Sequence, residues 1–76
     1  MILIAVEING YVMVYSKNKT LLFKKFGFLY NYTENYVAIA RNDAKTIIDI
    51  YDDKSKLVCT YPKDLVDTSN IQGMIF

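Results

Sequence analysis

The side chains that could do chemistry in this sequence are few. Histidine, the commonest general base near neutral pH, is absent from the 76 residues, and the only cysteine is Cys59. Cys59 alternates with Leu57 and Tyr61 in an apolar run, so we expect a small buried hydrophobic side chain and not a nucleophile.

The carboxylates give no metal-binding pattern. Asp49, Asp52 and Asp53 lie close in sequence, but they lack the alternating spacing of a calcium loop, and we interpret them as a solvated turn. Glu7 is the one ionisable residue in an apolar run next to a turn, where we expect it to reach solvent or pair with a lysine. The sequence therefore predicts no catalytic residue, no metal and no cofactor, and a protein that is not an enzyme.

The stretch "KKFGFLYNY", residues 24–32, offers a different chemistry. Its four aromatic residues recur at every second position and would share one face of a strand. A ladder of rings beside lysines could bind single-stranded nucleic acid by stacking and charge. The alternative is that the two phenylalanines belong to the core and the tyrosines border it, which is the commoner use of aromatic side chains. The aromatic residues are Phe26, Phe28, Tyr30 and Tyr32, and the lysines are Lys17, Lys19, Lys24 and Lys25.

Composition excludes several classes of protein. Nine basic and eight acidic residues leave a net charge of +1, too little for the broad positive field of a typical nucleic-acid or membrane binder. One cysteine cannot form an internal disulfide, and the opening run "MILIAV" is too short to span a membrane, so we expect a cytoplasmic protein. Ile, Asn, Lys and Tyr supply 30 of the 76 residues, as AT-rich coding sequences do, which hints at a phage or mobile element.

A hairpin is the clearest predicted element. Two β-branched runs over residues 2–8 and 11–15 flank Asn9-Gly10, a pair typical of two-residue turns that need positive φ. In this register Ile8 faces Tyr11, Val6 faces Met13 and Ile4 faces Tyr15. One face then carries Ile2, Ile4, Val6 and Ile8, and the other carries Leu3, Ala5, Val12 and Val14. Because both faces are apolar, both need cover, from the rest of the chain or from another chain.

The remaining pattern predicts further short strands. We expect strands over about 20–26, 36–41, 46–51 and 57–61, with one helical turn over 62–68 and a last strand over 71–76. Residues 43–52 are ambiguous, because Asp43 could cap a helix there, but four β-branched residues in five positions favour a strand. The prediction is a single small β-rich domain over residues 1–76, an all-β antiparallel barrel or sandwich of about seven strands. An α+β fold with a helix at 43–52 is the alternative.

These observations favour a non-catalytic protein-binding module. We expect a small phage or mobile-element inhibitor that covers a surface of a host enzyme, or a homodimer, because tyrosines supply contact area at low entropy cost. The predicted contact residues are Tyr11, Met13, Tyr15, Tyr30 and Tyr32. The alternative is a small SH3-like or OB-like barrel that binds single-stranded nucleic acid through Lys17, Lys19, Lys24, Lys25 and Phe28.

Overall fold

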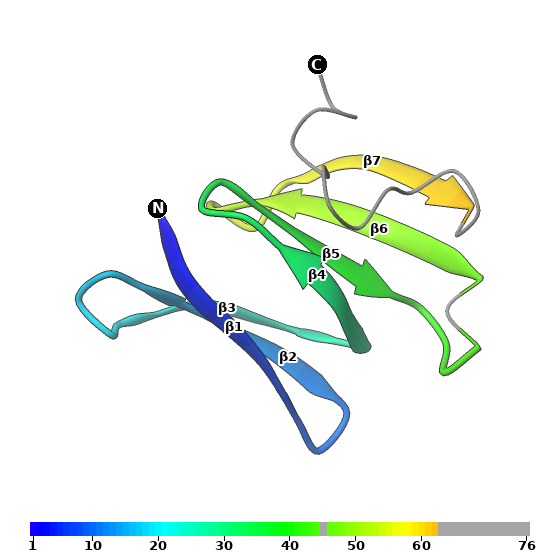
Figure 1. Ribbon diagram of the computed structural model, residues 1–76, viewed down its shortest axis with the longest axis horizontal. Helices are drawn as coiled ribbons and strands as arrows, with labels where there is room; N and C mark the ends of the chain where they lie inside the picture. The colour runs from blue at the N-terminus through cyan, green and yellow to red at the C-terminus, as the bar shows by residue number, and fades with distance from the viewer. Residues whose placement is uncertain (45, 63–76) are drawn as a thin grey trace.

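Seven antiparallel strands make up the part of the chain that this computed structural model describes, residues 1–44 and 46–62. The first sheet has the order β1-β2-β3 and the second the order β4-β5-β6-β7, so every pairing joins consecutive strands (Figure 1). The strands are β1 (Ile2–Ile8), β2 (Tyr11–Ser16), β3 (Leu21–Phe26), β4 (Phe28–Tyr32), β5 (Tyr36–Ala40), β6 (Ile47–Asp52) and β7 (Leu57–Pro62).

The predicted all-β class is confirmed, and of the two predicted architectures the two-layered one is found. The two sheets pack against each other over one shared cluster and do not close into a barrel. Residues 47–52 form strand β6, so the alternative helix at 43–52 is wrong; β-branched side chains in an extended backbone outweigh the cap at Asp43. The predicted helical turn over 62–68 and strand over 71–76 lie outside the described residues, except for Pro62, which ends β7.

The β1–β2 hairpin has the predicted turn and register. Asn9 and Gly10 have φ of 53° and 82°, and Ile8 pairs with Tyr11. A register shift between Ile2 and Ile4 changes one detail, because it moves Ile2 to the buried side. The prediction that Ile2 shares a face with Ile4 is therefore wrong.

Gly27 separates β3 from β4 and sends the chain from the first sheet to the second. Its φ is +146°, and an added Cβ would lie 2.7 Å from Ile39 Cγ2 and 2.8 Å from the Ala40 carbonyl oxygen. Only glycine allows this close approach to β5. The predicted continuous aromatic strand is thus two strands, and β4 is an element that the sequence pattern did not separate.

The shared cluster holds the two sheets together. Ile2, Ala5, Val12 and Val14 from the first sheet are buried against Val37 and Ile39 of β5. Two hydrogen bonds add to this packing. Ile2 N of β1 donates to the carbonyl of Glu34, in the turn between β4 and β5, at 2.6 Å, and Leu29 N of β4 donates to Glu7 Oε1 of β1 at 2.7 Å.

The opposite side of the second sheet has a cluster of its own. Ala38, Ala40, Ile48 and Ile50 are buried there, and half-buried Phe28, Tyr30, Tyr36, Cys59 and Tyr61 pack against them. Strand β5 is consequently buried on both faces, as the continuous apolar run "VAIA" favours.

Candidate functional site

The side of the first sheet turned away from the second sheet carries an apolar surface that is open to solvent. We call it the outer face. It is built by alternate residues of three strands, which share a side because paired residues of antiparallel strands point the same way. Its members are Ile4, Val6 and Ile8 of β1, Tyr11, Met13 and Tyr15 of β2, and Leu21, Lys24 and Phe26 of β3.

Several apolar members of the outer face are open to solvent. Phe26 is 74% exposed, Ile8 is 49% exposed and Leu21 is 44% exposed, whereas Ile4 and Tyr11 are near 40%. At about 200 Å² for a fully exposed large side chain, these five residues leave on the order of 500 Å² of accessible surface. That is as much as the largest patch on a typical monomer, and such patches are often functional.

Contacts among the side chains order the centre of the outer face. The rings of Tyr11 and Phe26 meet edge to face, with centroids 5.5 Å apart and an interplanar angle of 87°. Lys24 Nζ lies 4.9 Å from the centroid of the Tyr11 ring, a cation–π distance. The Tyr15 hydroxyl lies 4.0 Å from Met13 Sδ. Side chains fixed in this way lose less entropy when a partner covers them.

The charge on this side of the sheet is positive. Lys24 is the one ionised side chain among the nine members of the outer face, and Lys17 and Lys19 lie exposed in the turn after β2. Glu7 pairs with Val12 on the other side of the sheet and accepts the Leu29 N–H. Glu7 reaches solvent, as predicted, and its hydrogen bond with the Leu29 N–H also ties β1 to β4.

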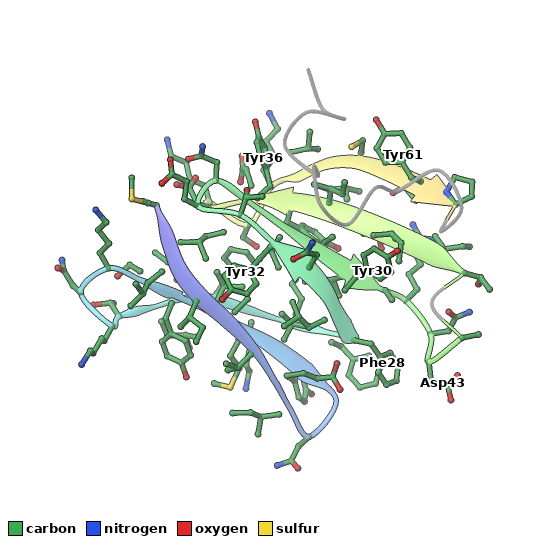
Figure 2. The ribbon with its side chains drawn as sticks, viewed as in Figure 1. Phe28, Tyr30, Tyr32, Tyr36, Asp43 and Tyr61 are labelled. Carbon is green, nitrogen blue, oxygen red and sulfur yellow. The ribbon has the colours of Figure 1, made fainter. Side chains whose placement is uncertain are left out.

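The aromatic residues of 26–32 do not share one face, so the ladder is wrong. The alternative, that both phenylalanines belong to the core, is wrong for Phe26, which is largely exposed, and agrees with the packing of Phe28. Phe26 lies on the outer face, Phe28 and Tyr30 pack against the cluster on the far side of the second sheet, and Tyr32 packs into the shared cluster. Figure 2 shows Tyr30 and Tyr32 on different sides of β4. Gly27 causes the first break, and a register shift between Leu29 and Asn31 causes the second.

The predicted lysine group is also divided. Lys24 and Lys25 point to opposite sides of β3, and Lys25 Nζ lies 5.0 Å from the centroid of the Tyr51 ring. Of the predicted protein-contact residues, the structure brings Tyr11, Met13 and Tyr15 together. Tyr30 and Tyr32 belong to other surfaces.

Asp49 is not part of a solvated turn, which corrects the interpretation from sequence. Its carboxylate is buried and accepts hydrogen bonds from Arg41 Nε at 2.8 Å, Arg41 Nη2 at 3.0 Å and Thr60 Oγ1 at 2.6 Å. Burial raises the pKa of Asp49, but these hydrogen bonds and the charge of Arg41 lower it by more, so its pKa lies below the ordinary 3.8. The Asp49 carboxylate thus joins β6 to Thr60 of β7 and to Arg41, the residue after β5, and has a structural role.

The other two aspartates do lie at a turn. Asp52 Oδ1 accepts the N–H groups of Lys54 and Lys56, each at 2.9 Å, and Asp53 Oδ2 lies 2.9 Å from the amino terminus of Met1. Within residues 1–44 and 46–62, His, Cys, Asp and Glu side chains form no group of three that could hold a metal ion. Nor is a pocket found in the part of the chain described.

Phe26 and Leu21 are members of the outer face that sequence reasoning did not assign to it. The signal for Phe26 is the Phe-Gly-Phe sequence, in which glycine with a close backbone neighbour ends one strand and begins the next. Once β3 ends at Phe26, its pairing with Tyr11 follows from the register of the meander.

No protein-family model, curated protein or solved structure matches this chain. Among the described residues there is no helix with the length and apolar character needed to cross a membrane.

Proposed function

We propose that this protein is a non-catalytic module that binds another protein through the outer face of its first sheet. The observation that supports this most directly is the apolar surface centred on Tyr11, Met13 and Phe26, which the fold leaves open to solvent. Aromatic residues and methionine are enriched in protein interfaces, and they form the centre of this patch together with Lys24.

The outer face would form the apolar centre of a contact. On the order of 500 Å² is a large part of the roughly 800 Å² that each partner buries in a standard interface. A flat sheet face of this size suits a protein surface, because small ligands bind in concave sites that bury most of their area.

The mode of action follows from the chemistry of the face. The outer face carries no carboxylate, thiol or imidazole. The protein would therefore act on its partner by covering part of the partner's surface. We propose inhibition or modulation of a host enzyme in a reducing compartment such as the cytoplasm, where the free thiol of Cys59 stays reduced.

The division of the aromatic residues and lysines favours this function over single-strand binding. Stacking on successive bases needs rings in a row beside a basic groove. Here Phe26 and Phe28 lie on different surfaces, and so do Lys24 and Lys25.

The test begins with affinity capture, in which this protein is the bait. The captured protein is then purified and titrated against the wild-type protein and two variants. Met13→Lys puts a charge at the centre of the outer face, and Val58→Lys makes the same kind of change at an exposed site on β7. We expect Met13→Lys to weaken binding at least about ten-fold, a loss of about 1.4 kcal/mol, and Val58→Lys to bind like the wild type. Urea unfolding should find both variants folded.

The same preparation distinguishes the alternative. Equal binding by Met13→Lys and the wild-type protein would refute the proposed surface. Binding of a single-stranded oligonucleotide that weakens steeply with added salt would support the nucleic-acid function instead.

A further inference from the structure

We propose that the partner is a different protein, which presents a carboxylate to Lys24 from within an apolar, acidic segment. This inference rests on the proposed function, since it concerns what covers the same outer face.

The position of Lys24 makes its charge matter. Lys24 pairs with Met13 near the middle of β2 and β3, and its ammonium lies 4.9 Å from the centroid of the Tyr11 ring. A partner that covers Tyr11 and Phe26 therefore also removes water from Lys24 Nζ. A buried ammonium without an anionic partner is costly, so the covering surface must supply a negative group.

A second copy of this chain cannot supply that group from the same face. The outer face contains a lysine and no acidic residue, so two outer faces in contact would bring two ammonium groups and no carboxylate. Glu7, the only acidic residue of strands β1 to β3, is on the opposite side of the sheet and bonds to Leu29 N. Charge complementarity thus favours a heterologous partner over the symmetric dimer.

Two lysines in the turn between β2 and β3 also favour an acidic partner for the outer face. Lys17 and Lys19 are exposed where the chain passes from β2 to β3, and they add positive charge at the margin. Because the whole chain carries only +1, a preference for acidic ligands would come from this local arrangement and not from a general field.

Two matched peptides test the inference without knowledge of the natural partner. In one, Leu and Phe alternate with Glu; in the other, the same apolar residues alternate with Lys. Fluorescence anisotropy with labelled peptides measures binding to the full chain, and amide chemical shifts locate it. We expect the Glu peptide to bind at least about ten-fold tighter at low salt, with shifts at residues of the outer face, and to lose affinity as salt rises.

Charge variants supply the controls. Lys24→Glu should reverse the peptide preference, and Lys24→Arg should keep it. Lys54→Glu makes the same change of net charge in the turn between β6 and β7, far along the chain from the outer face, and should leave the preference in place.

The outcomes separate this inference from the proposed function. Equal binding of both peptides, no binding of either, or a preference unaffected by Lys24→Glu would overturn the acidic partner, whereas Met13-dependent capture would still support the outer face as a protein-binding surface. Sedimentation of the isolated protein adds one more outcome. A dimer at micromolar concentration that Met13→Lys dissociates would mean that a second copy covers the face, and the inference would be wrong.

Discussion

Asp49 illustrates how one buried charge can organise three strands. Its carboxylate accepts two hydrogen bonds from the guanidinium of Arg41 and one from the hydroxyl of Thr60. The Arg41 side chain is 55% exposed, so the pair lies at the edge of the core, where its charge keeps contact with water. Such a pair avoids much of the cost of burying two ions.

The lowered pKa of Asp49 gives a pH dependence with a definite sign. A carboxyl with a folded-state pKa below its ordinary 3.8 stabilises the fold above that value, and the contribution is lost as pH falls through the folded-state pKa. We expect Asp49→Asn to lower the free energy of unfolding by about 1 to 3 kcal/mol near neutral pH, because it removes charge-assisted hydrogen bonds. Urea unfolding at several pH values measures the gap, which is the difference in the free energy of unfolding between the wild-type protein and the variant.

The gap between wild-type and variant proteins should stay constant from about pH 7 to pH 5 and shrink below about pH 4. A gap that persists undiminished into acid would mean that the charge of Asp49 contributes nothing. Thr60→Val is a useful companion, since it removes one hydrogen bond and keeps the ion pair with Arg41.

The role of Asp49 could not be predicted from the sequence alone. Arg41 and Thr60 lie 8 and 11 residues from it along the chain, and only the registers of β5, β6 and β7 bring the three side chains together. Without the register, three nearby aspartates are more simply interpreted as a solvated turn, and that interpretation holds for Asp52 and Asp53 alone.

At the scale of elements, Gly27 places two phenylalanines in different environments. Phe26 ends β3 with 74% of its surface exposed. Phe28 begins β4 and is half-buried against the cluster on the side of the second sheet turned away from the first. Phe28→Ala should lower the free energy of unfolding by at least about 2 kcal/mol, approaching the 3 to 5 kcal/mol of a core phenylalanine. Phe26→Ala should cost under about 1 kcal/mol, chiefly from its contact with Tyr11.

Denaturant unfolding of the two variants checks this pair directly. Similar losses for both would mean that Gly27 does not divide the aromatic run as the structure has it. Phe26→Ala should also weaken binding through the outer face, an effect that Phe28→Ala should lack as long as it remains folded.

Most elements could be predicted because their signals are local. The Asn-Gly turn defines the first hairpin and its register, and a short continuous apolar run defines β5. β4 was not separated from β3 because Gly27 lies inside an aromatic run, between Phe26 and Phe28, and a single Gly inside such a run is compatible with a continuous strand. What makes it a break is the nearness of Ala40, a contact between distant parts of the chain.

At the scale of the whole molecule, burial is concentrated in the second sheet. Val37, Ala38, Ile39 and Ala40 are all buried, so β5 has protein on both of its faces, whereas β3 is an edge strand with exposed residues. We expect the amides of β5 to exchange with solvent only through global unfolding and those of β3 to exchange faster, through local opening. Native-state hydrogen exchange measures both, and equal protection of the two strands would contradict this arrangement.

The candidate surface was partly predictable at this scale. The hairpin register puts Tyr11, Met13 and Tyr15 on one apolar face and Val12 and Val14 on the other, and a short chain has few elements with which to cover both. Which face stays open depends on the docking of Ala5, Val12 and Val14 onto β5, and no local pattern gives it.

The meander order of both sheets has a consequence for how this chain folds. Since each of the seven described strands pairs only with its neighbours in sequence, none of these pairings has to close a long loop. Folding rates fall as the sequence separation of native contacts grows, which makes sandwiches with distant pairings slow. Within residues 1–44 and 46–62, the long-distance encounter is the docking of β1 and β2 onto β4 and β5, and we expect this part of the chain to refold fast for an all-β protein.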